Sequence, residues 1–86
     1  MRTIYMSFVD SDKPKFLGAC LVHADNYIEA IETTWKRGCN PGGEIMAAEL
    51  QFLPDEKWYN RLLSKEQVEE MEAEIEAKAN GVVRTA

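Results

Sequence analysis

Cysteine and histidine are scarce in this chain of 86 residues, which contains two cysteines and one histidine. Cys20 and Cys39 do not form a CxxC pair, and His23 has no second histidine at a metal-binding spacing. A disulfide framework and a zinc site both need more of these residues. We therefore expect no metal and no other cofactor. Because small domains bury little surface, we expect self-association as a homo-oligomer to supply the missing stability.

Long hydrophobic runs are also absent. No segment approaches the roughly 18 apolar residues of a membrane span. The first residues lack the apolar stretch and small-residue cleavage site of a secretory signal. These absences predict a cytoplasmic protein without membrane contact, whose cysteines stay reduced. The length predicts one domain over residues 1–86.

Basic charge is not in excess anywhere in the chain. The net charge is −5, and as far as Gly43 five basic residues balance five acidic ones. From Glu44 onward five basic residues face ten acidic ones. Since domains that bind duplex nucleic acid are normally basic, we expect no general nucleic-acid binding.

Hydrophobic periodicity predicts three strands. Residues 3–9 and 44–53 alternate between apolar and polar, as half-buried strands do. Residues 16–22 are apolar on both phases, which is typical of a strand covered on two sides. Gly18 in this segment indicates a bulge or a close backbone approach.

The first predicted helix follows these two strands. Asp25 or Asn26 can cap it, and Asn26 with Glu29 forms a capping-box pattern. Gly38 stands where a left-handed C-cap is expected. We expect large apolar residues to form the buried stripe, with Ala30 and Thr34 at its edges. The stripe comprises Tyr27, Ile28, Ile31 and Trp35.

Two further helical segments end the chain. Pro54 opens a short helical turn, and a capping box of Ser64 and Gln67 begins an acidic amphipathic helix of about residues 64–80, with Gly81 as its C-cap. The predicted order is β-β-α-β-α-α. This order predicts a small α+β domain, a three-stranded sheet packed by helices on one face.

The segment Gly38-Cys39-Asn40-Pro41-Gly42-Gly43-Glu44 has two interpretations. It is a helix stop followed by a type II turn, or an anion nest in which successive N–H groups converge on a phosphate or carboxylate. It matches no known phosphate motif and follows a helix C-terminus, whose dipole disfavours anions. Trp35 beside it could stack on a base. The candidate ligand-binding residues are Trp35, Lys36, Arg37, Asn40, Gly42, Gly43 and Glu44.

No motif ties a nucleophile to His23 or to the neighbouring Asp25. We therefore predict no catalytic residues and no enzymatic activity. A metabolic enzyme, the competing interpretation, would depend on His23.

Two segments resemble a group of small uncharacterised proteins encoded by bacteriophages and prophages. They are Leu17-Gly18-Ala19-Cys20 through Ala24-Asp25, and Gly38 through Ile45, which together span the middle third of the chain. The resemblance implies a phage setting in the host cytoplasm and carries no activity. By analogy of size and setting, such proteins sequester nucleotide immune signals of the host as oligomers, or block host proteins.

Two functions are therefore expected. The first is a non-enzymatic accessory protein with an anti-defence role, which binds an anionic nucleotide-like ligand at the glycine turn as a homo-oligomer. The alternative is an interaction module or inhibitor that contacts a host protein through the acidic C-terminal helix. The glutamates of this helix have two further interpretations, a solvated face or a mimic of nucleic acid. Candidate interface residues are Val68, Met71, Ile75, Val82 and Val83.

Overall fold

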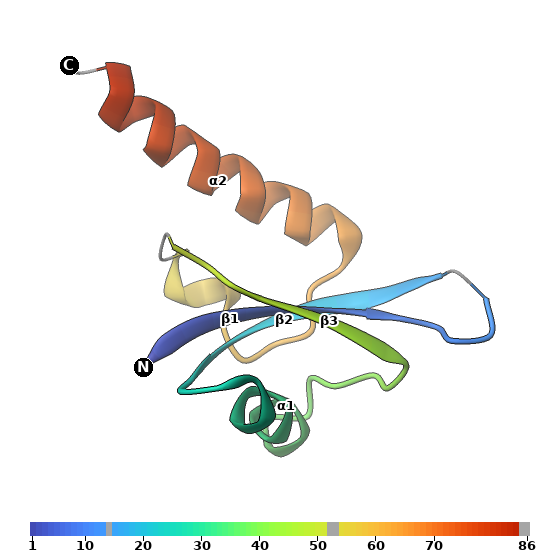
Figure 1. The fold of residues 1–86 in the computed structure, drawn as a ribbon. Coiled ribbons are helices and arrows are strands. Elements are labelled where there is room, and N and C mark those ends of the chain that lie inside the picture. The colour runs from blue at the N-terminus through green and yellow to red at the C-terminus, as the bar shows by residue number, and fades with distance from the viewer. Residues whose placement is uncertain (14, 52–53, 85–86) are drawn as a thin grey trace.

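The computed structural model describes residues 1–13, 15–51 and 54–84, with the backbone alone for 78–84. It has the predicted α+β architecture, with the short helical turn formed as a 3-10 helix, η1 (Figure 1). The elements are β1 (Arg2–Val9), β2 (Phe16–Ala24), α1 (Tyr27–Lys36), β3 (Glu44–Glu49), η1 (Glu56–Trp58) and α2 (Lys65–Arg84).

The three strands form one sheet in the order β2-β1-β3. β1 is antiparallel to both neighbours, and Ile4 lies between Val22 of β2 and Glu49 of β3. β2 and β3 are therefore parallel to each other, and the connection through α1 crosses over the central strand. The register with β2 shifts between Phe8 and Val9, next to Gly18, which confirms an irregularity at this glycine.

Both faces of the sheet are covered, which corrects the expectation of helices on one face. α1 lies on one face, and η1 and α2 lie on the other (Figure 1). The reason is β2, whose residues are buried on both phases, as predicted. The cluster under α1 contains Ile4, Met6, Phe8, Cys20, Val22, Ala24, Ala30 and Cys39. The cluster under η1 and α2 contains Ala19, Leu21, Trp58, Tyr59, Leu63, Val68 and Met71.

α1 begins as predicted but buries a different stripe. The Asn26 side chain accepts a hydrogen bond from the Glu29 N–H at 2.8 Å. The buried residues are Ala30 and Thr34, whereas Ile28 and Trp35 are 73% and 62% exposed. Two small residues one turn apart let the helix backbone approach the sheet closely, so the larger side chains point outward.

α2 also starts at its predicted cap and then runs further than expected. Ser64 and Gln67 exchange the two hydrogen bonds of a capping box, at 2.9 and 3.2 Å. The helix continues to Arg84, so Gly81 lies within it and is not its C-cap. Its C-terminal part extends beyond the sheet (Figure 1), and the molecule measures 46 × 28 × 18 Å.

β3 is shorter than the predicted segment and ends at Glu49, while Phe52 of that prediction lies outside the described residues.

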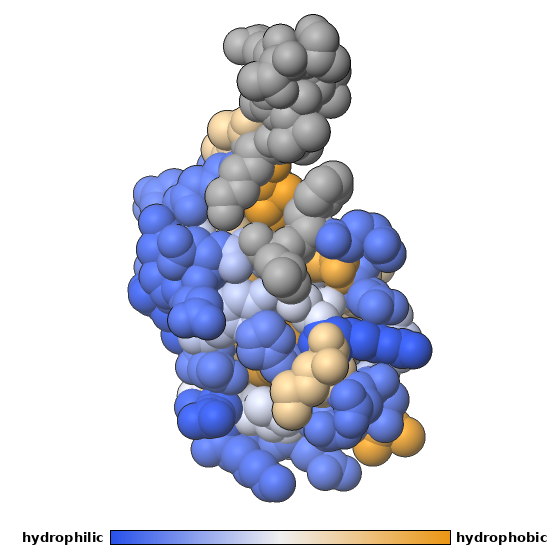
Figure 2. Space-filling view, turned by 90° about the vertical axis from the view of Figure 1, so that its left-hand side faces the viewer, coloured by the Kyte–Doolittle hydropathy of each residue, from blue (hydrophilic) through white to orange (hydrophobic). Residues whose placement is uncertain are grey.

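The side of the molecule turned toward the viewer in Figure 2 is mostly hydrophilic, with hydrophobic residues in a few separate patches. A broad apolar surface is therefore not visible from this side.

Truncating Met71 tests the docking of α2. Its side chain is 2% exposed, so Met71→Ala should lower the free energy of unfolding by about 2–5 kcal/mol. Ile28→Ala is the control, because this 73% exposed side chain should change stability by less than about 0.5 kcal/mol. Urea denaturation measures both values. Equal, small effects would mean that α2 is not packed on the sheet as described.

Candidate functional site

The glycine turn is closed by hydrogen bonds within the chain. Gly38 and Gly42 adopt positive φ angles of 70° and 84°, which for Gly38 is the conformation of a left-handed helix cap. The Asn40 side chain donates to the Thr34 hydroxyl at 3.0 Å and accepts the Gly42 N–H at 2.8 Å. Asn40 thus fastens the turn to α1, and it is a structural residue in this arrangement.

The same contacts limit what the turn can offer an anion. The Gly42 N–H is donated to Asn40 and does not point at a ligand. Gly43 packs against the backbone of β1, where a Cβ atom would overlap the Val9 carbonyl oxygen. A nest needs consecutive free N–H groups, and at least one of them is already used.

The two cysteines meet beneath this turn. Cys20 of β2 and Cys39 are buried, and their sulfur atoms lie 2.7 Å apart as free thiols. Burial, and then the neighbouring Cys39, raises the pKa of the Cys20 thiol. Both thiols are shielded from solvent, and the pair anchors the turn to the sheet.

The remaining predicted ligand residues do not converge. Trp35, Lys36 and Arg37 are exposed at the end of α1. Glu44 is also exposed, but it shares a phase with Met46, which pairs with Ser7 on the sheet face opposite α1. The structure thus separates the glutamate from the cationic and aromatic residues by the sheet.

His23 has a packing partner. Its ring stacks on that of Tyr59, with centroids 4.3 Å apart and an interplanar angle of 15°. The Tyr59 hydroxyl in turn shares a hydrogen bond of 2.9 Å with the buried Thr3 hydroxyl. These contacts fasten the segment after η1 to the sheet, and His23 takes part in this packing.

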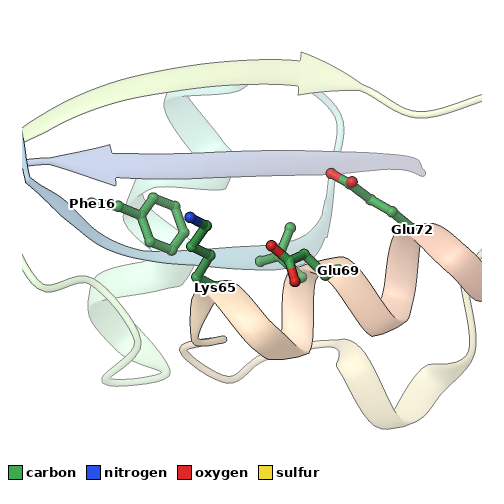
Figure 3. A pocket seen from close by; sticks show the side chains of 5 residues that line it. Phe16, Lys65, Glu69 and Glu72 are labelled. Atoms are coloured by element: carbon green, nitrogen blue, oxygen red, sulfur yellow. The ribbon is translucent and has the colours of Figure 1, made fainter.

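A groove lies instead on the opposite face, between α2 and the sheet (Figure 3). It encloses about 330 Å³. Phe16 closes one end, at the start of β2, and Glu72 extends from α2 toward β1 at the other end. The lining residues are Phe16, Lys65, Val68, Glu69 and Glu72.

The groove exists because α2 covers only part of this sheet face. Burial decreases across the strands, from Leu21 of β2, which is fully buried, to half-buried Ser7 of β1 and to Met46 of β3, which is 71% exposed. α2 packs along β2, and the strands β1 and β3 lie beside it (Figure 3). The helix is one wall of the groove, Phe16 of β2 closes one end, and the partly exposed strands β1 and β3 lie beside it.

The electrostatic character of the groove is acidic. Burial, and then the negative charge of Glu72, raises the pKa of the Tyr5 hydroxyl, which lies on the same face of β1. Glu69 adds a second carboxylate, and Lys65 is the single cation among the described residues of the lining. A ligand that matches this lining carries positive charge near Glu72 and apolar surface near Phe16.

Glu74, two residues after Glu72 on α2, is occupied by another contact. It accepts a hydrogen bond from the Trp58 indole at 3.3 Å and forms an ion pair with Lys57 at 3.1 Å. The bonds from Lys57 and then from Trp58 lower the pKa of the Glu74 carboxyl group. Glu74 thus clamps α2 to η1 and fixes the wall of the groove.

The candidate interface stripe on α2 is the contact that docks the helix. Val68 and Met71 are buried in the chain's own core, and Ile75 packs against it. They are therefore not a free surface. They provide the apolar cover for the sheet face under α2. Val82 and Val83 lie outside the residues whose side chains are described.

Sequence reasoning missed the groove because Phe16 is far along the chain from the α2 residues Lys65 and Glu69. The signal that was available is the mismatch between a narrow apolar stripe on α2 and a wide sheet. Among the described residues no group of three or more potential metal ligands occurs, and no described helix is long and apolar enough to cross a membrane.

Comparison with known proteins gives no family assignment. No family model, no curated protein and no solved structure matches the chain.

Alanine at the two adjacent glycines tests the close approach of the turn to β1. Both residues have positive φ, so both substitutions should cost about 1 kcal/mol of folding free energy. Gly43→Ala also forces Cβ into the Val9 carbonyl and should cost about 2 kcal/mol more. Gly42→Ala is the matched control, because its Cβ would meet open space. Equal costs in chemical denaturation would contradict the packing of Gly43.

Proposed function

We propose that this protein is a small, non-enzymatic binding module that holds a short basic segment of a partner protein in the groove beside α2. The observation that carries the proposal is the lining of the groove, which combines the carboxylates of Glu69 and Glu72 with the apolar side chains of Phe16 and Val68.

The charge of the groove favours a cationic ligand. α2 carries six glutamates between residues 66 and 76, and two of them line the groove. An anionic nucleotide would face these carboxylates, whereas lysine or arginine side chains would pair with them. Complementary potentials also speed the encounter of the two partners.

The size and shape of the groove favour an extended segment. Its volume is near the lower end of the range of small-molecule pockets, roughly 300–1,000 Å³, so it has room for one or two side chains of a longer segment. The strands β1 and β3 lie beside the groove (Figure 3), and side chains of both are partly exposed. A peptide can place one apolar side chain against Phe16 and a basic one near Glu72, and can continue over these strands.

This proposal develops the interaction-module alternative and changes its surface. The apolar stripe is used to dock α2, so the glutamates and the groove remain as the contact surface. The glycine turn supports an anionic ligand less well, because Gly42 donates its N–H to Asn40. In the phage setting that the resemblance implies, the partner is a host protein in the cytoplasm, and blocking it is an anti-defence role.

Peptide binding tests the proposal. A peptide of alternating lysine and leucine, titrated by calorimetry, should bind the wild-type protein and weaken as salt is added, because salt screens the ion pairs. Glu69→Lys with Glu72→Lys should reduce the affinity by roughly a hundredfold, since like charges facing each other cost several kcal/mol.

The matched control changes the net charge equally on another face of the helix. Glu66 and Glu70 are exposed and do not line the groove, so Glu66→Lys with Glu70→Lys should bind within about threefold of wild type. A peptide with glutamate in place of lysine should not bind. Equal loss in both double variants would mean that bulk charge, and not the groove, attracts the peptide, and the proposal would be wrong.

A further inference from the structure

The two outer edges of the sheet differ. The outer edge of β2 is closed by the segment that follows η1, where Ala19 and Leu63 exchange two backbone hydrogen bonds of 3.0 and 2.7 Å. The Leu21 carbonyl accepts a third bond, from the Asn60 N–H at 2.8 Å. In the described part of the chain, no segment pairs with the outer edge of β3. This edge is therefore available for a further strand.

The hydrogen-bond alternation identifies which groups point outward. Leu50 follows β3 in register opposite Thr3, and its N–H donates to the Thr3 carbonyl at 2.9 Å. In an antiparallel pair, hydrogen-bonded positions alternate. Ala48, Met46 and Glu44 therefore bond to β1, whereas the N–H and C=O groups of Ile45, Ala47 and Glu49 point away from it.

The other side of the sheet supports this assignment. The odd-numbered residues of β1 bond to β3, so the even-numbered ones bond to β2. The outward groups of β2 then belong to its odd-numbered residues. Ala19 and Leu21 are the residues whose outward groups meet the segment after η1.

We propose that the open edge of β3 pairs with β3 of a second copy of this chain, antiparallel and centred on Met46, to form a continuous six-stranded sheet. A two-fold axis normal to the sheet leaves each side chain on the same face of the sheet in both copies. Directly opposite residues share a face, so an even-numbered residue must lie opposite an even-numbered one, and an odd-numbered residue opposite an odd-numbered one. Ile45 then lies opposite the second copy's Ala47, and both present outward N–H and C=O groups to each other. The edge is thus complementary to itself.

The side chains of β3 also suit this pairing. The four residues between Glu44 and Glu49 are uncharged, so the centre of the edge lacks the lysine or proline that blocks many natural edges. In the Met46-centred register Glu44 lies opposite Ala48 of the second copy, so no carboxylate directly faces another carboxylate. Met46, which is 71% exposed in one copy, packs against its counterpart.

The dimer would also complete the groove. The two-fold axis puts α2 of both copies on the same face of the joined sheet, each along its own β2 (Figures 1 and 3). The partly exposed strands β1 and β3 of both copies then lie between two helical walls. This last step depends on the proposed function, whereas the pairing of the edges does not.

Charged substitutions at Met46 test the dimer. Sedimentation equilibrium of the wild-type protein should show a monomer–dimer equilibrium. Met46→Lys and Met46→Glu should each raise the dissociation constant by roughly a hundredfold or more, because like charges meet across the two-fold axis. An equimolar mixture of the two variants should recover a heterodimer. Both variants must be folded to pair, so recovery also excludes misfolding. A monomeric wild-type protein, or a mixture that does not pair, would overturn the proposal.

Cysteine cross-linking tests the register. A non-hydrogen-bonded pair holds Cα atoms about 4.5 Å apart, within the range that a disulfide spans. Met46→Cys should therefore give a covalent dimer under mild oxidation, whereas Ala48→Cys should give little. Preferential cross-linking of Ala48→Cys would contradict the register centred on Met46.

Proline scanning separates the edge from the fold. Ala47→Pro removes an outward N–H and should abolish dimerisation while the monomer stays folded. Ala48→Pro removes an N–H bonded to β1 and should unfold the strand. If both variants remain dimeric, the edge is not the interface. Peptide binding by the Ala47→Pro monomer reports on the groove separately, so failure of the dimer and failure of the proposed function are distinguishable.

Discussion

The two-sided burial of β2 is the constraint on which the rest of the structure depends. A strand that is apolar on both phases must be covered on both faces, and one chain of this length has few elements to do so. α1 covers one face through Ala30 and Thr34, and α2 with η1 covers the other through Met71 and Trp58. The helices thus lie over the two faces of β2, and the outer strand β3 is largely exposed.

This uneven cover produces the features that a partner could use. α2 follows β2, so β3 is exposed and β1 is partly exposed on this sheet face, beside the glutamates of α2. The segment after η1 closes the edge of β2 while it delivers the chain to α2. The groove and the open edge are thus consequences of one arrangement, and both lie next to β3.

Much of the fold could be predicted from local sequence signals. The caps at Asn26 and Ser64, the positive φ of Gly38 and the burial of β2 all follow from chemistry within a few residues. The α1 stripe could not be predicted from hydrophobicity, since Ile28 and Trp35 are exposed while Thr34 is buried. Close packing of a helix on a sheet selects small residues there, and the Thr34 hydroxyl finds partners in the Ile31 carbonyl and Asn40.

The candidate site was harder to predict for a related reason. The glycine turn is conspicuous because its residues are adjacent in sequence. Its Asn40 side chain, however, already bonds to the Thr34 hydroxyl and to the Gly42 N–H. The groove joins Phe16 to Lys65 and Glu72, and only the sheet order and the path of α2 bring these together. Both depend on long-range pairing, for which no local pattern exists.

Amide hydrogen exchange of β3 at several protein concentrations tests the central claim, that one sheet edge is closed and the other is open for a partner strand. At low concentration the N–H groups of Ile45 and Ala47 should exchange quickly, whereas those of Met46, Ala48 and Ala19 should be protected. As concentration rises, Ile45 and Ala47 should become protected together. If their exchange does not depend on concentration while the protein associates, β3 is not the edge through which it pairs.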